Sequence, residues 1–258
     1  MGAIACGFGA PGARQYIGTM GADRLCRRGN AWDGWLAGRC AVCHAWTAGA
    51  VCEECVTLFG QPRNRCRTCA AILPPNLAHC GGCVRQPPPV IGVLAAVDYD
   101  YPWAQLVRAF KFHGDIAWAR LFARLMRSTP WLEPALEDSD WILPMPLSTQ
   151  RLRERGFNQS LVLACAVADA QVRKVRHDAL LRIRDTLPQS SLPQSERQAN
   201  VARAFVVHPD HFTALRGKKV ILVDDVMTTG ASLHAAAQAL IRAGTEPVTA
   251  LVFARTPG

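Results

Sequence analysis

The residues best suited to chemistry lie between Val220 and Ser232, in the stretch VILVDDVMTTGAS. Four branched apolar residues predict a parallel strand, buried on both faces, that ends at two adjacent carboxylates. A hydroxyl-rich turn follows at 228–232, and residues 233–243 have helical composition up to Gly244. Such a turn directs unpaired N–H groups and the positive end of a helix dipole at one point, which suits a phosphate.

The two carboxylates, Asp224 and Asp225, indicate the other half of the ligand. They would repel a phosphate but accept hydrogen bonds from neighbouring hydroxyls, each worth roughly 1.5–3 kcal/mol. A diol beside a phosphate describes a ribose 5-phosphate. The alternative is an ordinary strand-to-helix crossover with a capped helix start. That alternative is disfavoured, because charges at the end of a buried strand need partners.

The same stretch resembles the 5-phosphoribosyl 1-diphosphate (PRPP) signature of type I phosphoribosyltransferases. The resemblance implies that the acidic pair holds the ribose hydroxyls and that the turn holds the 5-phosphate. The turn residues implied are Thr228, Thr229, Gly230, Ala231 and Ser232.

A second group of candidate residues lies in the stretch RLRERGFNQ, residues 151–159, which we expect to form a loop. A short strand at 141–143 precedes it and is halted by two prolines. Arginines at alternate positions, followed by glycine and amides, supply the forked donors that a diphosphate needs. A basic, solvated turn is the alternative. The candidates are Arg153, Arg155, Gly156, Asn158 and Gln159.

Lys111 is a further candidate for phosphate binding. Apolar residues between Trp103 and Phe110 have helical spacing, which places Lys111 at the end of the expected helix beside Gly114. From there its ammonium group could reach a phosphate. A solvated lysine is the equally weighted alternative.

Eight cysteines form four CxxC hooks: CAVC, CEEC, CRTC and CGGC. The two-residue gap lets both thiolates of a hook face one tetrahedral ion, and two hooks complete a structural zinc site. Four disulfides are the alternative, disfavoured in a reducing cytoplasm. Short loops favour pairing of consecutive hooks, although the spacing leaves the pairing open. The candidate ligands are Cys40, Cys43, Cys52, Cys55, Cys66, Cys69, Cys80 and Cys83.

The elements that must position these residues fall into three expected parts of the 258-residue chain. We expect a flexible tail at 1–35, a double zinc ribbon at 36–86 and a phosphoribosyltransferase-like domain at 90–258. Pro87–Pro89 should act as a spacer between the last two. No apolar run is long enough to cross a membrane and no secretory signal is evident, so we expect a cytoplasmic protein without a membrane span.

The net charge of +9 is weak support for nucleic-acid binding. Residues 1–90 hold nine arginines and four acidic residues, which gives +5. A zinc ion held by four thiolates carries about −2, so two such sites would cancel most of this excess.

Residues 184–200 form a long polar segment, which we expect to be a lid over the site. A reaction that builds positive charge on a ribose carbon must exclude water, because the activated sugar would otherwise be hydrolysed. The expected lid residues are Arg184, Thr186, Gln189, Arg197 and Asn200.

With the four hooks, the arginine-rich stretch, the lid and the acidic strand in this order, the chain resembles the ComF family of competence-associated proteins across about residues 36–256. The resemblance implies an α/β fold: a type I phosphoribosyltransferase-like parallel sheet flanked by helices, preceded by a small zinc-ribbon module with four-cysteine metal sites. The site would lie at the carboxyl edge of the strands. Structural Zn²⁺ is implied, together with Mg²⁺ bridging diphosphate and ribose oxygens.

The resemblance leaves two classes of function open. One is a PRPP-dependent phosphoribosyltransferase, a glycosyltransferase with an unidentified acceptor. The other is an adaptor in DNA uptake that binds PRPP or single-stranded DNA without turnover, with a DNA-uptake helicase or recombination proteins as partners. Diphosphate release from PRPP would favour the first, and zinc-dependent, salt-sensitive binding of single strands the second.

Overall fold

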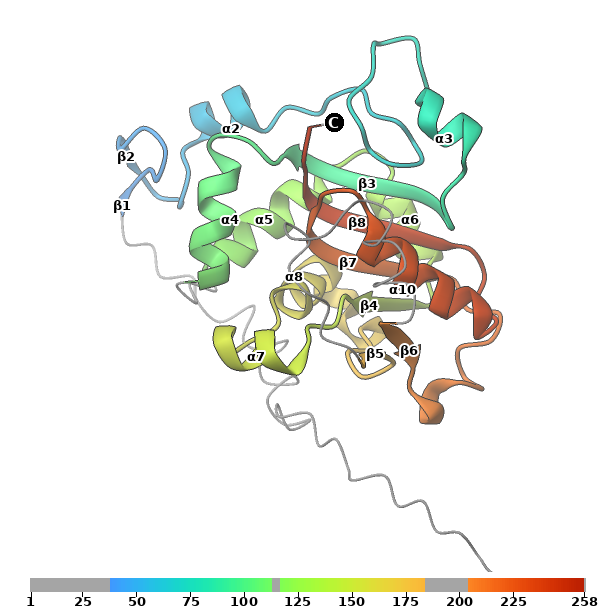
Figure 1. Cartoon of the computed structure of the whole chain (residues 1–258). Coiled ribbons are helices and arrows are strands. Elements are labelled where there is room, and N and C mark those ends of the chain that lie inside the picture. The colour runs from blue at the N-terminus through green and yellow to red at the C-terminus, as the bar shows by residue number, and fades with distance from the viewer. Residues whose placement is uncertain (1–37, 113–116, 184–203, 258) are drawn as a thin grey trace, which may run out of the picture.

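The computed structural model describes residues 38–112, 117–183 and 204–257. At its centre lies a four-stranded parallel sheet with the strand order β3-β8-β7-β4 (Figure 1). Helices cover both faces of this sheet, so the expected fold class is confirmed. The strands are β3 (Val90–Asp98), β4 (Trp141–Pro144), β7 (Val220–Met227) and β8 (Val248–Arg255).

The lack of alternation in β7 follows from its two buried faces. Ile221 and Val223 belong to one hydrophobic core, and Val220 and Leu222 belong to the other. The first core is shared with α4 (Trp103–Phe112), α5 (Trp118–Arg127), α6 (Leu132–Asp138) and α8 (Gln159–Ala168). The second is shared with α10 (Ala231–Arg242) and the hairpin of β5 (Leu180–Arg182) and β6 (Phe205–Val207). The described residues also form the 3-10 helices η1 (Asp169–Lys174) and η3 (Pro209–His211).

Strand β7 is longer than the sequence predicts. It does not end at Val223 but continues through both aspartates to Met227, paired with β8 along its length. Its other neighbour, β4, ends at Pro144, which is paired with Val223. Because β4 stops there, the edge of β7 that carries Asp224 and Asp225 has no neighbouring strand among the described residues, and this opens the site.

The expectation of a loop at 151–155 is wrong, because these residues form helix α7 (Thr149–Arg155). The helix begins after Ser148, whose hydroxyl oxygen accepts a hydrogen bond from the N–H of Arg151 at 3.4 Å. It ends at Gly156, which has a φ of 76°. Arginine, leucine and glutamate are good helix formers, so local propensity agrees with this cap.

The cysteine-rich module packs onto the sheet domain and is not held apart by Pro87–Pro89. Cys40 and Cys52 belong to the core that contains Trp103, and Ala70 belongs to the core beneath α10. The indole N–H of Trp103 also donates to the carbonyl oxygen of Phe59 at 2.8 Å. The module contains β1 (Gly38–Arg39), β2 (Trp46–Thr47), α2 (Glu53–Phe59) and α3 (Gly81–Arg85).

The expected tail at 1–35 and the expected lid at 184–200 lie outside the described residues. Within the part of the chain that the structure describes, no helix has both the length and the apolar character needed to span a membrane.

Candidate active site and cysteine clusters

A cleft of about 270 Å³ opens where β4 and β7 end. Its walls come from segments far apart in the chain: the end of α4, the β4–α7 connection, α7, the start of α8, β5 and the β7–α10 turn. Acidic, basic and hydroxyl groups thus face one space. The polar lining residues are Lys111, Arg151, Arg155, Gln159, Ser160, Arg182, Asp224, Asp225, Thr228 and Ser232.

The acidic pair has partners that also line the cleft. Asp225 is buried, and its carboxylate lies 3.0 Å from the ammonium nitrogen of Lys111. Asp224 accepts hydrogen bonds from the hydroxyl of Ser160 at 2.8 Å and from the N–H of Asp225 at 2.9 Å. Both carboxylates are therefore held toward the cleft.

The pKa of Asp224 is raised to about 6. Burial is the main cause, and the negative charge of Asp225 adds to it. The hydrogen bond from Ser160 and the charge of Lys111 oppose this rise without cancelling it.

The turn after β7 depends on a glycine. Gly230 has a φ of 81°, and a Cβ atom there would lie 2.5 Å from the terminal carbon of Met227. A larger residue would be strained and would clash. Helix α10 begins at the next residue, Ala231, so its positive end faces the cleft. Thr229 does not line the cleft; its hydroxyl oxygen accepts from the N–H of Ala231 at 3.4 Å.

The basic wall of the cleft is one face of α7. Arg151 and Arg155, four residues apart, both line the cleft, whereas Arg153 is exposed and does not. The guanidinium group of Arg155 donates to the side-chain oxygen of Gln159 at 3.0 Å. Burial lowers the pKa of Arg155, and the charges of the two aspartates oppose this. The side-chain nitrogen of Gln159 is buried without a partner among the described residues, so the cleft offers a free donor.

Two of the predicted diphosphate residues have structural roles. Asn158 caps α8, accepting from the N–H groups of Ser160 at 2.9 Å and Leu161 at 3.3 Å, and its amide donates to the carbonyl oxygen of Met145. Gly156 ends α7. Neither lines the cleft.

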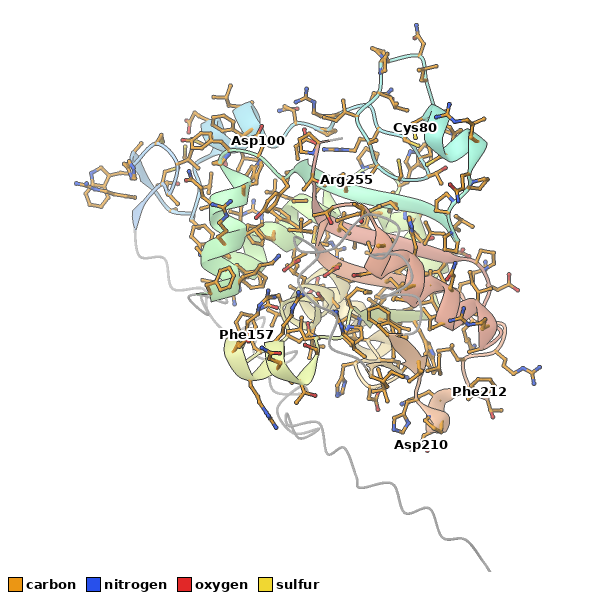
Figure 2. The ribbon with its side chains drawn as sticks, in the orientation of Figure 1. Cys80, Asp100, Phe157, Asp210, Phe212 and Arg255 are labelled. Carbon is orange, nitrogen blue, oxygen red and sulfur yellow. The ribbon has the colours of Figure 1, made fainter. Side chains whose placement is uncertain are left out.

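Phe157 anchors the corner between α7 and α8 (Figure 2). Its buried ring packs edge-on against that of Phe110 in α4, with 5.7 Å between ring centroids. This contact fixes the corner relative to the helix that carries Lys111.

Three polar lining residues are absent from the predicted site residues: Arg151, Ser160 and Arg182. Helical periodicity would have found Arg151, because it lies one turn before Arg155. Ser160 adjoins the predicted Gln159 at the start of a helix. No sequence pattern near Arg182 indicates a site residue, because only the tertiary position of β5 brings this side chain to the cleft.

The eight cysteines form two tight groups, and the predicted consecutive pairing is confirmed. In each group the four sulfur atoms lie within 4.8 Å of one another. The groups, called here cluster 1 and cluster 2, are Cys40, Cys43, Cys52 and Cys55, and Cys66, Cys69, Cys80 and Cys83.

The donor set of both clusters is compatible with structural zinc. The N–H of Cys52 donates to the sulfur of Cys40, and the N–H of Cys80 donates to that of Cys66, each at 3.3 Å. Burial opposes ionisation of Cys40 and Cys66, but such backbone hydrogen bonds outweigh it and lower the pKa of each thiol to about 6. Burial instead raises the pKa of Cys55 and Cys83. These thiols would lose their protons on binding a tetrahedral Zn²⁺ ion.

Comparison with known proteins agrees with this geometry. Residues 157–258 match the family model described as phosphoribosyl transferase domain. DNA utilization protein YhgH of Escherichia coli O6:H1 (strain CFT073) is 30% identical over 234 residues, covering 86% of this chain and 98% of that protein. The chain belongs to the ComF family.

Two further ComF relatives carry names from competence. Competence protein F of Haemophilus influenzae (strain Rd) is 28% identical over 201 residues, covering 74% of this chain and 84% of the relative. Competence protein ComFC of Bacillus subtilis (strain 168) is 31% identical over 147 residues, covering 57% and 56% of the two chains. In this ComF chain the phosphoribosyltransferase match contains the acidic pair and the turn, whereas Lys111 and both clusters precede it.

Proposed function

We propose that this ComF-family chain binds PRPP in the cleft and acts as a PRPP-dependent phosphoribosyltransferase. One observation carries the proposal: a carboxylate pair, a helix N-terminus and a basic helix face line the same cleft. PRPP has the matching groups, namely a ribose diol, a 5-phosphate and a diphosphate.

Each group of PRPP has a partner in the cleft. Asp224 and Asp225 accept hydrogen bonds from the ribose hydroxyls, and the turn at 228–232 receives the 5-phosphate at the start of α10. Arg151 and Arg155 face the diphosphate. Lys111, paired with Asp225 in the free protein, lines the same cleft and is available to a phosphate group of PRPP.

These oxygen-rich surroundings also fit Mg²⁺, which takes few direct protein ligands and binds largely through substrate oxygens. The residues that would hold it are Asp224 and Asp225, together with oxygens of PRPP. When bound, it would neutralise part of the negative charge of the diphosphate.

The protein's own part in the reaction is orientation and charge stabilisation. The bond between the anomeric carbon and the diphosphate breaks through an oxocarbenium-like state, and a bond to the acceptor forms. Arginine and lysine side chains stabilise the leaving diphosphate, while the aspartates fix the ribose. Exclusion of water is assigned to the predicted lid at 184–200, outside the described residues.

Binding of PRPP by isothermal titration calorimetry, with and without Mg²⁺, tests the first step. Wild-type protein should bind, whereas Asp225→Asn should abolish binding and leave the zinc content unchanged. Asp210→Asn is the matched control, because Asp210 has an 83% exposed side chain on η3 and does not line the cleft. Undiminished binding by Asp225→Asn would remove this residue from the site.

Turnover requires a separate assay. Diphosphate release from PRPP, measured across a panel of nucleobases, should identify the acceptor class. Release in the wild type but not in Asp225→Asn would establish the enzyme. PRPP binding without release for any acceptor would leave a PRPP-binding protein that is not a transferase.

A DNA-binding adaptor is the second candidate, favoured by one feature of the cysteine-rich module. Trp46 is 73% exposed, and the guanidinium carbon of Arg39 lies 5.6 Å from its ring centroid. Exposed aromatic rings beside arginines are stacking platforms for bases of single strands. The names of the relatives, DNA utilization and competence proteins, agree with such a role, in which a DNA-uptake helicase or recombination proteins would be partners.

Fluorescence anisotropy with a labelled single-stranded oligonucleotide distinguishes this candidate. Salt-sensitive binding that is weakened in Trp46→Ala, but not in Trp131→Ala, would support it, since Trp131 is equally exposed at the start of α6. Absence of binding at low salt would exclude it. For either function we propose a cytoplasmic location, because cysteines grouped as metal ligands and not joined in disulfides are typical of a reducing compartment.

A further inference from the structure

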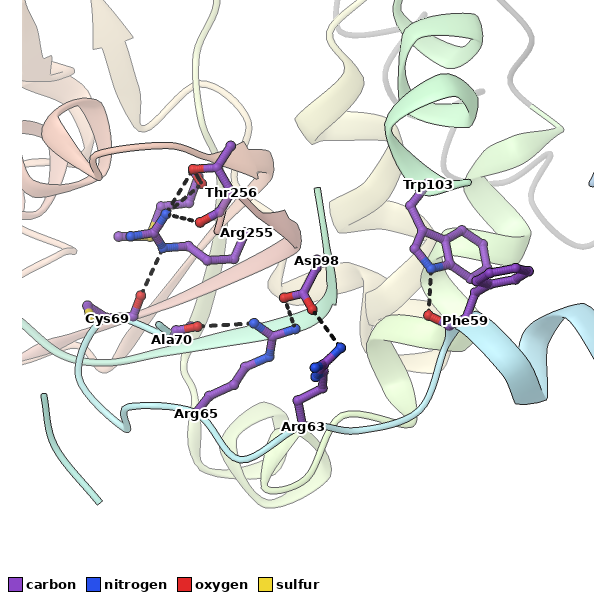
Figure 3. A network of polar contacts seen from close by, with 10 residues as sticks. Phe59, Arg63, Arg65, Cys69, Ala70, Asp98, Trp103, Arg255 and Thr256 are labelled. Carbon is purple, nitrogen blue, oxygen red and sulfur yellow. Dashed lines mark hydrogen bonds and ion pairs between the residues drawn. The ribbon is translucent and has the colours of Figure 1, made fainter. Parts of the chain in front are cut away.

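One side chain bridges cluster 2 and the strand that leads into the phosphate turn. Arg255, the last residue of β8, donates from its Nε to the carbonyl oxygen of Cys69 at 3.1 Å (Figure 3). Its Nη1 lies 3.4 Å from the carbonyl oxygen of Met227, the last residue of β7. Arg255 is half-buried, so these bonds are shielded from bulk water.

Met227 is held at both its backbone and its side chain. Its carbonyl oxygen also accepts from the N–H of Thr256 at 3.0 Å, and Arg255 donates to the hydroxyl of Thr256 at 2.9 Å and to its carbonyl oxygen at 2.6 Å. The side chain of Met227 is buried beside Gly230. The backbone position of the turn therefore depends on the hydrogen bonds among Met227, Arg255 and Thr256.

The other end of the bridge is equally fixed. Arg65 donates to the carbonyl oxygen of Ala70 at 3.1 Å and pairs with Asp98 at 2.7 Å, as Figure 3 shows. The N–H of Val93 in β3 donates to the carbonyl oxygen of Arg67 at 3.2 Å. The 66–70 knuckle thus lies in one defined position beside the edge strand β3, and Arg255 connects that position to the turn.

We propose that Arg255 is a positioning residue that couples cluster 2 to the phosphate turn, so that an ordered Cys66–Cys69 knuckle keeps the turn in its binding conformation. The assignment of the 5-phosphate of PRPP as the ligand of the turn rests on the proposed function. Cluster 1 packs instead on the side of α4, and among the described residues its contacts do not include the turn. The coupling is therefore specific to cluster 2.

Amide hydrogen exchange of the full-length, zinc-loaded protein tests the coupling without any ligand. In Arg255→Gln, the peptide covering residues 226–232 should exchange about tenfold faster than in the wild type, while zinc content and exchange in β4 stay unchanged. Arg255→Lys keeps the positive charge but lacks the planar guanidinium group with its several N–H donors. It should therefore not restore protection of the turn from exchange. Arg242→Gln, at the exposed end of α10, is the matched control and should not change exchange in the turn. Unchanged exchange in Arg255→Gln would overturn the proposal.

A double-mutant cycle separates coupling from a merely local effect. Cys83→Ser, which disrupts cluster 2, should accelerate exchange of the turn in the wild-type background but by less than about twofold further in Arg255→Gln. Cys43→Ser, which disrupts cluster 1, should leave the turn unchanged. Full additivity of Cys83→Ser and Arg255→Gln would refute the coupling.

PRPP binding is measured on the same variants as a second readout. Weaker binding in Arg255→Gln and Cys83→Ser, but not in Arg242→Gln, is expected. If the wild type itself does not bind PRPP, the proposed function fails, whereas the exchange measurements still decide the role of Arg255.

Discussion

At the scale of single residues, the site depends on two carboxylates with different surroundings. Asp225 is paired with a lysine, whereas Asp224 receives a hydroxyl and a backbone N–H. The pair was predictable from the sequence, because adjacent aspartates after a buried strand are a local pattern. Their partners were not, since Ser160 and Lys111 come from helices 64 residues and more than a hundred residues away.

The raised pKa of Asp224 predicts opposite pH dependences for stability and ligand binding. Its pKa is about 6 in the folded protein, above its ordinary value, so the folded state binds a proton more readily than the unfolded chain. Its contribution to stability is therefore full below pH of about 4 and lost as pH rises through about 6. PRPP needs the ionised carboxylate as an acceptor, so affinity should rise across the same interval.

Denaturant unfolding and calorimetric binding at pH 5, 6 and 7 measure both trends. Asp224→Asn is the control, because the amide keeps an acceptor for Ser160 and cannot titrate. Subtracting its profile removes the titration of histidines and of the phosphates of PRPP. Parallel profiles for wild type and Asp224→Asn would show that Asp224 does not titrate in this interval.

At the scale of elements, strands and helices with strong patterns were predictable, and α7 was not. The short strand at 141–143 follows from its apolar run, and the helix at 103–112 follows from apolar residues at helical spacing. The alternating arginines at 151–155 favour a loop in the sequence, because a charged stretch has no apolar stripe to reveal a helix. The difference matters for the site, since a helix places Arg151 and Arg155 on one face and Arg153 on the other.

This geometry predicts unequal effects of neighbouring arginines. Arg151→Gln should weaken binding of inorganic diphosphate at least about tenfold, as expected for loss of one charge-assisted hydrogen bond. Arg153→Gln, which removes the same charge from the exposed face, should change it less than about twofold, because exposed charges are screened. Calorimetry with diphosphate measures both, and equal losses would show that only the net charge of α7 matters.

At the scale of the whole molecule, the cysteine-rich module is part of the fold. Cluster 1 contributes Cys40, Cys52 and Cys55 to the core beneath α4, and the knuckle of cluster 2 contributes Ala70 to the core beneath α10. Four hooks in sequence predicted the two clusters, because ligand spacing is local. Their packing on opposite faces of one sheet was not predictable, since Pro87–Pro89 indicates only a boundary.

Zinc removal should therefore destabilise the sheet domain as well as the module. Structural zinc sites supply folding free energy directly, and here the ligands share cores with α4 and α10. A loss of a few kcal/mol would lower the melting temperature by roughly 5–10 °C for a chain of this size. Thermal unfolding with a strong chelator, followed by calorimetry, should show one transition at lower temperature, and added Zn²⁺ should restore it. Two transitions, of which the larger is unaffected by chelation, would show instead that the sheet domain folds independently of both clusters.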